Sequence, residues 1–275
     1  MKILVGVDLS DQAFAAVEQI GLLCRPVEVV IVHGVAEAVT MQGTVEFRQA
    51  LLDAGRQVVE RCRTLLPAET PSIRTLCQAQ DPVSFILDSA AMIKPDLIVM
   101  GTRGRSRMME VFGGSVSHRI LLHATSPTLI VRVKARPITR VLIAVEGRED
   151  AIRLQTWLTA HPFKNPIAVT IISVVPPLHD VGEQLLVERE SWSEQSKREA
   201  EQVVNEMAKA LTSPQFTVSP DVRMGDPVKT VCDVGQSHDL IVLSSHGRKG
   251  FNRFMLGSVS EKIVHRAERS VLVVR

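Results

Sequence analysis

The sequence predicts an α/β protein made of two tandem doubly wound domains. Two observations support this prediction. The chain repeats itself in order when shifted by 143 residues, and within each copy short apolar runs alternate with helical patterns. Parallel strands joined by helices form a sheet covered on both faces, because crossover connections are right-handed.

The repeat extends through most of the chain. Four pairs of segments recur in the same order: Ile3–Asp8 with Val141–Glu146, Asp96–Met100 with Asp239–Leu243, Gly114–Ser117 with Gly257–Ser260, and Leu129–Arg132 with Leu272–Arg275. The first pair matches at a smaller offset than the others, which indicates small insertions in loops. We therefore expect one domain over residues 1–136 and a second over 137–275.

Each element of the first copy follows from its pattern. Apolar runs rich in β-branched residues predict strands at 2–8, 27–33, 72–77, 96–101 and 127–133. Helices are expected after Ser10 or Asp11, within 44–66, after Asp81-Pro82 and from about Ser115, because these positions carry capping residues or helical spacing. In the second copy, a helix rich in charge at about 183–211 is expected to face solvent.

Composition is that of an ordinary soluble chain. Hydrophobic residues make up 45% and charged residues 23%, and the net charge of +2 gives no general electrostatic attraction to nucleic acid or an anionic membrane. No apolar stretch approaches the roughly 20 residues of a membrane span, and Asp8 interrupts the opening run before it resembles a signal peptide. Four cysteines without metal-ligand spacing indicate buried free thiols, so we expect a cytoplasmic protein.

The loop after the fourth strand is a candidate phosphate site. It contains Gly101, Arg103 and Gly104, then nine residues, then Gly114 and Ser115. Glycines let backbone N–H groups approach an anion, and the following helix directs its N-terminus at it. Arg103 balances the charge of a phosphate in this interpretation. The alternative is that the glycines only form a turn and that Ser115 only caps the helix.

The first strand ends at Asp8, which is the second candidate position. A carboxylate there can accept hydrogen bonds from a ribose or hold a metal ion beside phosphates. The alternative is a helix cap or a turn residue. The second copy has Glu146 at this position, which keeps the charge on a longer side chain.

Taken together, these loops resemble the nucleotide-binding signature of the universal stress proteins. ILVGVDLS resembles their opening strand, and SPTLIVRV and RSVLVVR resemble their closing strand. The resemblance covers both copies almost end to end. It implies an adenine-nucleotide alpha-hydrolase-like fold with strand order 3-2-1-4-5 in each domain. It also implies ATP binding, with Mg as a candidate companion ion. Adenine would lie against the loop after the second strand, where Gly34 and Val174 match.

The second copy departs from this signature. Ser244 stands where the first copy has Gly101, and His246 stands for Arg103. We therefore expect ATP in the first domain, at Asp8, Gly34 and the loop from Gly101 to Ser115. The second domain would offer a weaker site from Val174, Gly247, Gly257 and Ser258. No catalytic residue is assigned, and the histidines show no recognisable metal-ligand spacing.

A nucleotide-binding regulatory module for the stress response is the leading hypothesis. A weak ATPase is the enzymatic alternative, although the lysine-containing phosphate loop of many ATPases is absent from the sequence. A phosphoacceptor receiver is disfavoured, because residues 73–77 lack the aspartate that it needs. A structural role without nucleotide is an alternative for the second domain. We expect an internal pseudo-dimer in which Leu129–Arg132 pairs with Leu272–Arg275, and a homodimer is a further assembly that the sequence allows.

Overall fold

The computed structural model describes residues 1–36, 44–102, 116–177, 186–245 and 256–275, and for residues 186–190 only the backbone. The chain forms two compact units, Met1–Pro137 and Ile138–Arg275, each considered below by itself. The pairing predicted between their closing strands stays a prediction.

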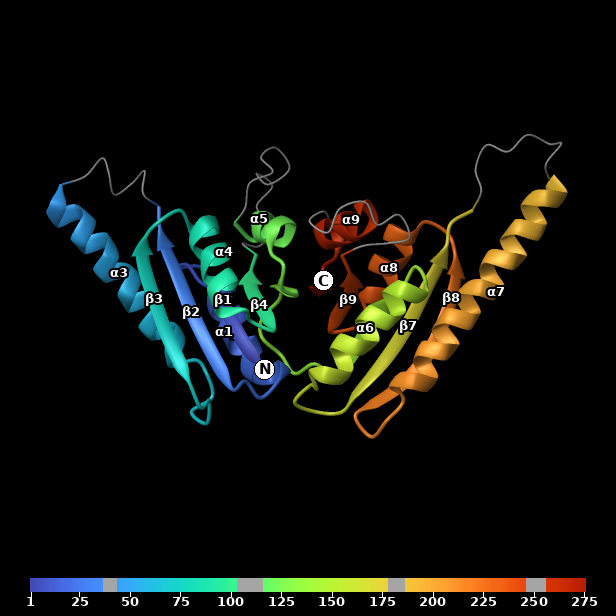
Figure 1. Cartoon of the computed structure of the whole chain (residues 1–275), viewed down its shortest axis with the longest axis horizontal. Coiled ribbons are helices and arrows are strands. Elements are labelled where there is room, and N and C mark those ends of the chain that lie inside the picture. Colours follow the sequence, from blue (N-terminus) through green and yellow to red (C-terminus); the bar gives the residue numbers. More distant parts are fainter. Residues whose placement is uncertain (37–43, 103–115, 178–185, 246–255) are drawn as a thin grey trace. The chain divides into compact units, whose positions relative to one another are not determined.

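Unit 1 is a parallel sheet between two layers of helices (Figure 1). Its strands are β1 (Lys2–Gly6), β2 (Glu28–Val35), β3 (Ile73–Ala79), β4 (Leu97–Gly101) and β5 (Thr128–Val131). Its described helices are α1 (Asp11–Leu23), α3 (Val45–Arg63), α4 (Pro82–Ile93) and α5 (Val116–His123). The strands lie in the order β3-β2-β1-β4-β5, and every neighbouring pair is parallel. The predicted order 3-2-1-4-5 is therefore confirmed here.

Unit 2 repeats this architecture. Its strands are β6 (Arg140–Ala144), β7 (Ile167–Val175), β8 (Phe216–Met224), β9 (Leu240–Ser244) and β10 (Ser270–Val274). Its described helices are α6 (Arg148–Ala160), α7 (Leu186–Leu211), α8 (Pro227–Gly235) and α9 (Ser258–Arg266). The order β10-β9-β6-β7-β8, again all parallel, is the same 3-2-1-4-5 arrangement counted from the start of the unit.

The central strands are buried on both faces. Ile3, Leu4 and Val5 of β1 have no exposed surface, and Val141, Leu142 and Ile143 of β6 match them. Continuous apolar runs suit these strands because helices cover both sides of a parallel sheet. The helices begin where capping residues allow. Ser10 accepts a hydrogen bond from the Ala13 N–H at 3.2 Å, and Asp81 caps α4 with Pro82 in its first turn.

The charged helix α7 is amphipathic. Side chains such as Val204, Met207 and Leu211 are buried, and the helix packs on β7 and β8. Its opposite face carries exposed ion pairs one turn apart, such as Lys197 with Glu201 at 3.8 Å. The predicted solvent-facing surface is thus one side of a helix whose other side belongs to the core.

The cysteines and the helix lengths bear on two further expectations from the sequence. All four cysteines are free; Cys24 and Cys62 are buried, and Cys77 and Cys232 are half-buried. Burial raises the pKa of the Cys62 thiol to about 11, although Arg61 opposes this and Asp8 adds to it. Within the described ranges, no helix has the length and apolar character needed to cross a membrane.

Candidate functional site

In each unit the chain order reverses at the middle of the sheet. In unit 1 β1 lies between β2 and β4. The connection after β1 leads to β2 on one side, and the connection after β3 returns past β1 to β4 on the other side. Crevices for ligands form at such a point, outside the carboxyl ends of the strands. Three predicted residues lie at this edge: Asp8 follows β1, Gly34 is near the end of β2, and Gly101 ends β4.

The remaining predicted positions divide into two groups. Arg103, Gly104, Gly114, Ser115 and Gly247 lie outside the described residues. In unit 2, Val174 is half-buried near the end of β7, Gly257 precedes α9, and Ser258 is the exposed first residue of that helix.

Asp8 organises the turn between β1 and α1. Its Oδ1 accepts a hydrogen bond from the backbone N–H of Ser10 at 2.9 Å and a second, short one from the Ser10 hydroxyl. The same hydroxyl oxygen accepts from the Ala13 N–H and so caps the helix. The Oδ1 of Asp8 therefore acts as the turn acceptor that the alternative interpretation predicts. The carboxylate as a whole is half-buried and lies at the predicted ligand edge.

His33 connects the ends of β1 and β2. Its Nδ1 lies 2.8 Å from the carbonyl oxygen of Val7, so this nitrogen carries the proton and donates. Gly55 of α3 passes close to the ring, because a Cβ at that position would lie 2.8 Å from His33 Cδ2. The histidine is thus held in place by the fold.

Gly34 is required by a close approach of the backbone. A Cβ there would lie 2.8 Å from the Cα of Pro82 and 3.0 Å from the carbonyl oxygen of Gln80. The connection between β3 and α4 therefore passes directly over Gly34. A larger residue would push this connection away from the edge predicted to contact adenine.

Gly101 also has a packing reason, which differs from the two that the sequence suggested. A Cβ there would lie 2.6 Å from the carbonyl carbon of Gln12 and 2.9 Å from the nitrogen of Ala13. The first turn of α1 therefore crosses the end of β4 at backbone contact distance. Left-handed backbone is not the reason, since Gly225 is the glycine with a positive φ, 144°, among the residues described.

Unit 2 has a side-chain cluster where unit 1 has this crossing. Ser244, only 4% exposed, ends β9. Its hydroxyl oxygen accepts a hydrogen bond from Arg153 Nη1 at 2.7 Å, and its carbonyl oxygen accepts from the Ser260 hydroxyl at 2.8 Å. The Gly257 N–H donates to the carbonyl oxygen of Ser245 at 2.8 Å. This backbone group is therefore already engaged within the protein.

Asp150 is the buried acid of this cluster. It is 7% exposed, and its Oδ2 accepts from the Glu146 N–H at 2.9 Å. Its Oδ1 is buried and accepts no hydrogen bond of normal geometry from the described residues. Burial raises the pKa of Asp150 to about 6, against the lowering effects of the Glu146 N–H, the Ser244 hydroxyl and Arg153.

Sequence reasoning did not find Asp150 or Arg153. The signal was available, because the first strands of the two copies align at an offset of 138 residues. At that offset Asp150 falls on Gln12 and Arg153 falls on Ala15. Both differences lie outside the glycines and Asp8, which carry the predicted signature.

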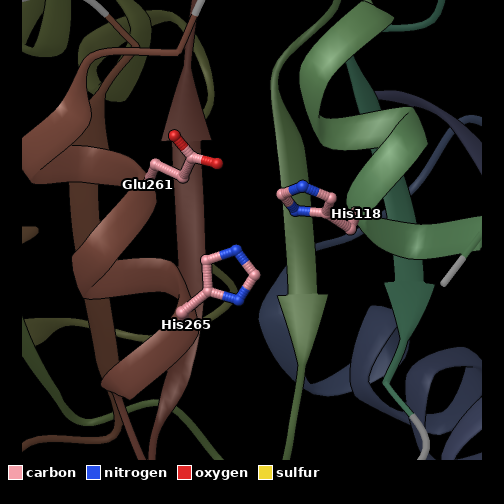
Figure 2. Close-up of side chains that lie close together, drawn as sticks. All are labelled: His118, Glu261 and His265. Carbon is pink, nitrogen blue, oxygen red and sulfur yellow. The ribbon is translucent and has the colours of Figure 1, made fainter. Parts of the chain in front are cut away.

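Helix α9 carries two side chains that can bind a metal ion. In unit 2, Glu261 and His265 lie one helical turn apart on α9 and project from the same side of it (Figure 2). His118, also shown in Figure 2, belongs to α5 of unit 1. A pair of donors on one helix falls short of the three or four protein ligands of a typical zinc site. We therefore assign no metal to this pair.

Comparison with known proteins assigns the chain to a family. The model of the universal stress protein family matches residues 1–132 and again 137–275. A universal stress protein of Mycolicibacterium smegmatis is 25% identical over 308 aligned positions, which cover 99% of this chain and 96% of that protein. Universal stress protein YxiE of Bacillus subtilis is 30% identical over 145 positions, 48% of this chain and 98% of that protein.

Solved structures show the same fold. A universal stress protein from Archaeoglobus fulgidus superposes with a TM-score of 0.69 at 20% identity, covering 100% of this chain and 96% of that one. A structure from Pseudomonas aeruginosa, described as that of a putative universal stress protein, gives a TM-score of 0.62 at 15% identity, with coverages of 99% and 92%. The chain therefore belongs to the universal stress protein family, with a match to the family domain in each of its two units.

Proposed function

We propose that this protein binds ATP in unit 1 and acts as a nucleotide-dependent regulatory module in the stress response. One observation carries the proposal. The half-buried Asp8 and the end of β4 at Gly101 lie at the carboxyl edge of unit 1, where the chain order reverses between β1 and β4. Membership of the family and the signature read from the sequence support ATP as the proposed ligand of this edge.

The residues of unit 1 fit such a ligand. Helix α5 starts at Val116, immediately after the signature residues Gly114 and Ser115, so its N-terminus follows the phosphate loop. Arg103 and Gly104 would contact the phosphates, and the Asp8 carboxylate would hold a ribose hydroxyl or a Mg²⁺ ion. Gly34 would contact the adenine through its backbone.

We propose binding rather than turnover as the main activity. The sequence lacks the lysine-containing phosphate loop of many ATPases. This difference favours a protein that holds the nucleotide, with slow hydrolysis as the competing outcome.

Calorimetric titration with Mg-ATP tests the proposal on the intact chain. We expect one ATP per chain in the wild type, loss of that site in Gly104→Trp, and retention of it in the matched variant Gly247→Trp. Absence of binding in the wild type would refute the proposal. Phosphate release measured in the same samples distinguishes a binding protein from an ATPase.

The free cysteines bear on where this protein works. Four free thiols, two of them buried, suit a reducing compartment. We propose a cytoplasmic location on this basis. Thiol labelling of protein taken directly from its native cells tests this location. We expect all four thiols to react after denaturation.

A further inference from the structure

Three sequence differences between the units meet at one place in unit 2. Asp150, Arg153 and Ser244 replace Gln12, Ala15 and Gly101 of unit 1. In unit 1 the corresponding place is a backbone crossing with no room for a Cβ. In unit 2 it holds a carboxyl group, a guanidinium and a hydroxyl. We call these three residues of unit 2 the acid cluster.

Within the acid cluster, Arg153 and Ser244 are in direct contact. Arg153 Nη1 donates to the Ser244 hydroxyl oxygen at 2.7 Å. The Ser244 hydroxyl and Arg153 both favour the charged form of the Asp150 carboxyl, and burial opposes it. The Oδ1 of Asp150 is buried without a hydrogen bond of normal geometry in the described structure. Burial therefore keeps this carboxyl protonated to a higher pH than an exposed aspartate.

The acid cluster adjoins the end of unit 2 where a ligand would bind. The Ser244 carbonyl oxygen accepts from Ser260, which lies in the first turn of α9. This helix is the counterpart of α5, whose N-terminus follows the phosphate loop of unit 1. One residue, Ser244, therefore separates the Asp150 carboxyl from the helix turn that would face a phosphate.

Among the residues that the structure describes, few other charges act on Asp150. Glu146, in the turn before α6, disfavours its ionisation, and Arg153 favours it. From α7, Glu206 pairs with Arg148 at 2.9 Å on the exposed side of the two helices. Strand β10, which also packs against α6, contributes Ser270 and apolar side chains. Within the acid cluster, the proton on Asp150 therefore decides whether the carboxylate offsets the positive charge of Arg153.

We propose that Asp150 sets the ligand preference of unit 2 by its protonation, excluding the polyphosphate of ATP when ionised and admitting it when protonated. This inference rests on the proposed ATP binding of unit 1, whose equivalent position carries the neutral Gln12. Ionised Asp150 repels a nearby phosphate because both are negative and the carboxyl is shielded from water. A proton on the carboxyl removes that charge without breaking the hydrogen bond between Glu146 N–H and Oδ2.

Titration of the intact chain with Mg-ATP at about pH 7.5 and about pH 5 tests the inference. We expect the wild type to bind one ATP per chain at the higher pH and two at the lower. Asp150→Asn should bind two ATP per chain at both pH values. At the higher pH its second site should bind ATP at least about tenfold more tightly than the second site of the wild type. Adding Gly247→Trp should remove the second site.

Glu149→Gln is the matched control. Glu149 is the exposed neighbour in the same helical turn, so this variant removes an equal charge without touching the acid cluster, and it should behave as the wild type. The unit 1 site reports how protonation of ATP itself alters binding over the same pH range. If Asp150→Asn fails to fold, as judged by circular dichroism, the wild type at the two pH values decides alone.

The outcomes separate the two proposals. One site at both pH values, or two sites in the wild type at the higher pH, overturns the role of Asp150 and leaves ATP binding by unit 1 intact. No binding in any variant at either pH overturns the function proposed for unit 1 instead.

Discussion

At the scale of single residues, Asp150 links the stability of unit 2 to pH. Its pKa of about 6 in the folded protein lies above the ordinary 3.8 of an aspartate. The folded state therefore holds this proton more tightly than the unfolded state, and the free energy of unfolding falls as the pH rises through about 4 to about 6. The penalty is complete above the folded pKa and absent below the unfolded one.

We predict that Asp150→Asn removes this pH dependence. Relative to the variant, the wild type should lose up to about 3 kcal/mol of unfolding free energy between about pH 4 and about pH 7. Urea unfolding at several pH values in this range measures the difference, and Glu149→Gln should run parallel to the wild type. Parallel curves for the wild type and Asp150→Asn would contradict the prediction.

Residues of the candidate site differ in how far the sequence could predict them. The sequence predicts Gly101 from its place in a phosphate loop. Its packing requirement comes from Gln12 and Ala13, which only the folded α1 brings near. The pKa of Asp150 likewise responds to the hydroxyl of Ser244, a residue distant in the chain. Local pattern identifies such positions, whereas long-range packing decides what each side chain does there.

Among the elements, the aspartate before the fourth strand of each unit has a connecting role. Asp239 Oδ2 accepts hydrogen bonds from the Thr139 N–H at 2.9 Å, the Thr139 hydroxyl at 2.8 Å and the Arg140 N–H at 2.9 Å. In unit 1, Asp96 accepts from the Lys2 N–H at 2.7 Å. The repeated aspartate thus ties the start of the first strand to the start of the fourth.

We predict that Asp239→Ala lowers the unfolding free energy by about 2 to 3 kcal/mol, because three donors at the start of β6 lose a charged acceptor. Asp239→Asn should cost less, since its amide oxygen can still accept. Urea unfolding measures both. As a control, Asp233→Ala changes another aspartate of unit 2, on α8, with little expected effect. Equal stability of Asp239→Ala and the wild type would refute the connecting role.

Elements themselves were largely predictable from the sequence. The strands of unit 1 lie within two residues of their expected ends, because buried parallel strands show continuous β-branched runs. Helix α7 was less well predicted. Its charged residues suggested a solvated face, and the buried side that includes Val204 and Met207 is recognised only once β7 and β8 provide its contacts.

For the whole molecule, duplication has kept the fold and separated the chemistry of the two ligand edges. Both units have strand order 3-2-1-4-5. Unit 1 keeps a backbone crossing at Gly101, and unit 2 has the acid cluster around Ser244. A sheet tolerates such differences because its core lies between the helices, away from the strand ends where ligands bind.

This asymmetry predicts that ATP protects only one unit at neutral pH. Hydrogen exchange of the intact chain with saturating Mg-ATP should slow at the turn containing Asp8 and Ser10 and at the end of β4, because a ligand that binds only the folded state suppresses local opening. The corresponding turn at Glu146 and the end of β9 should exchange as without ATP. Gly104→Trp should abolish the protection and so serves as the control. Equal protection in both units would show that the acid cluster does not exclude the nucleotide.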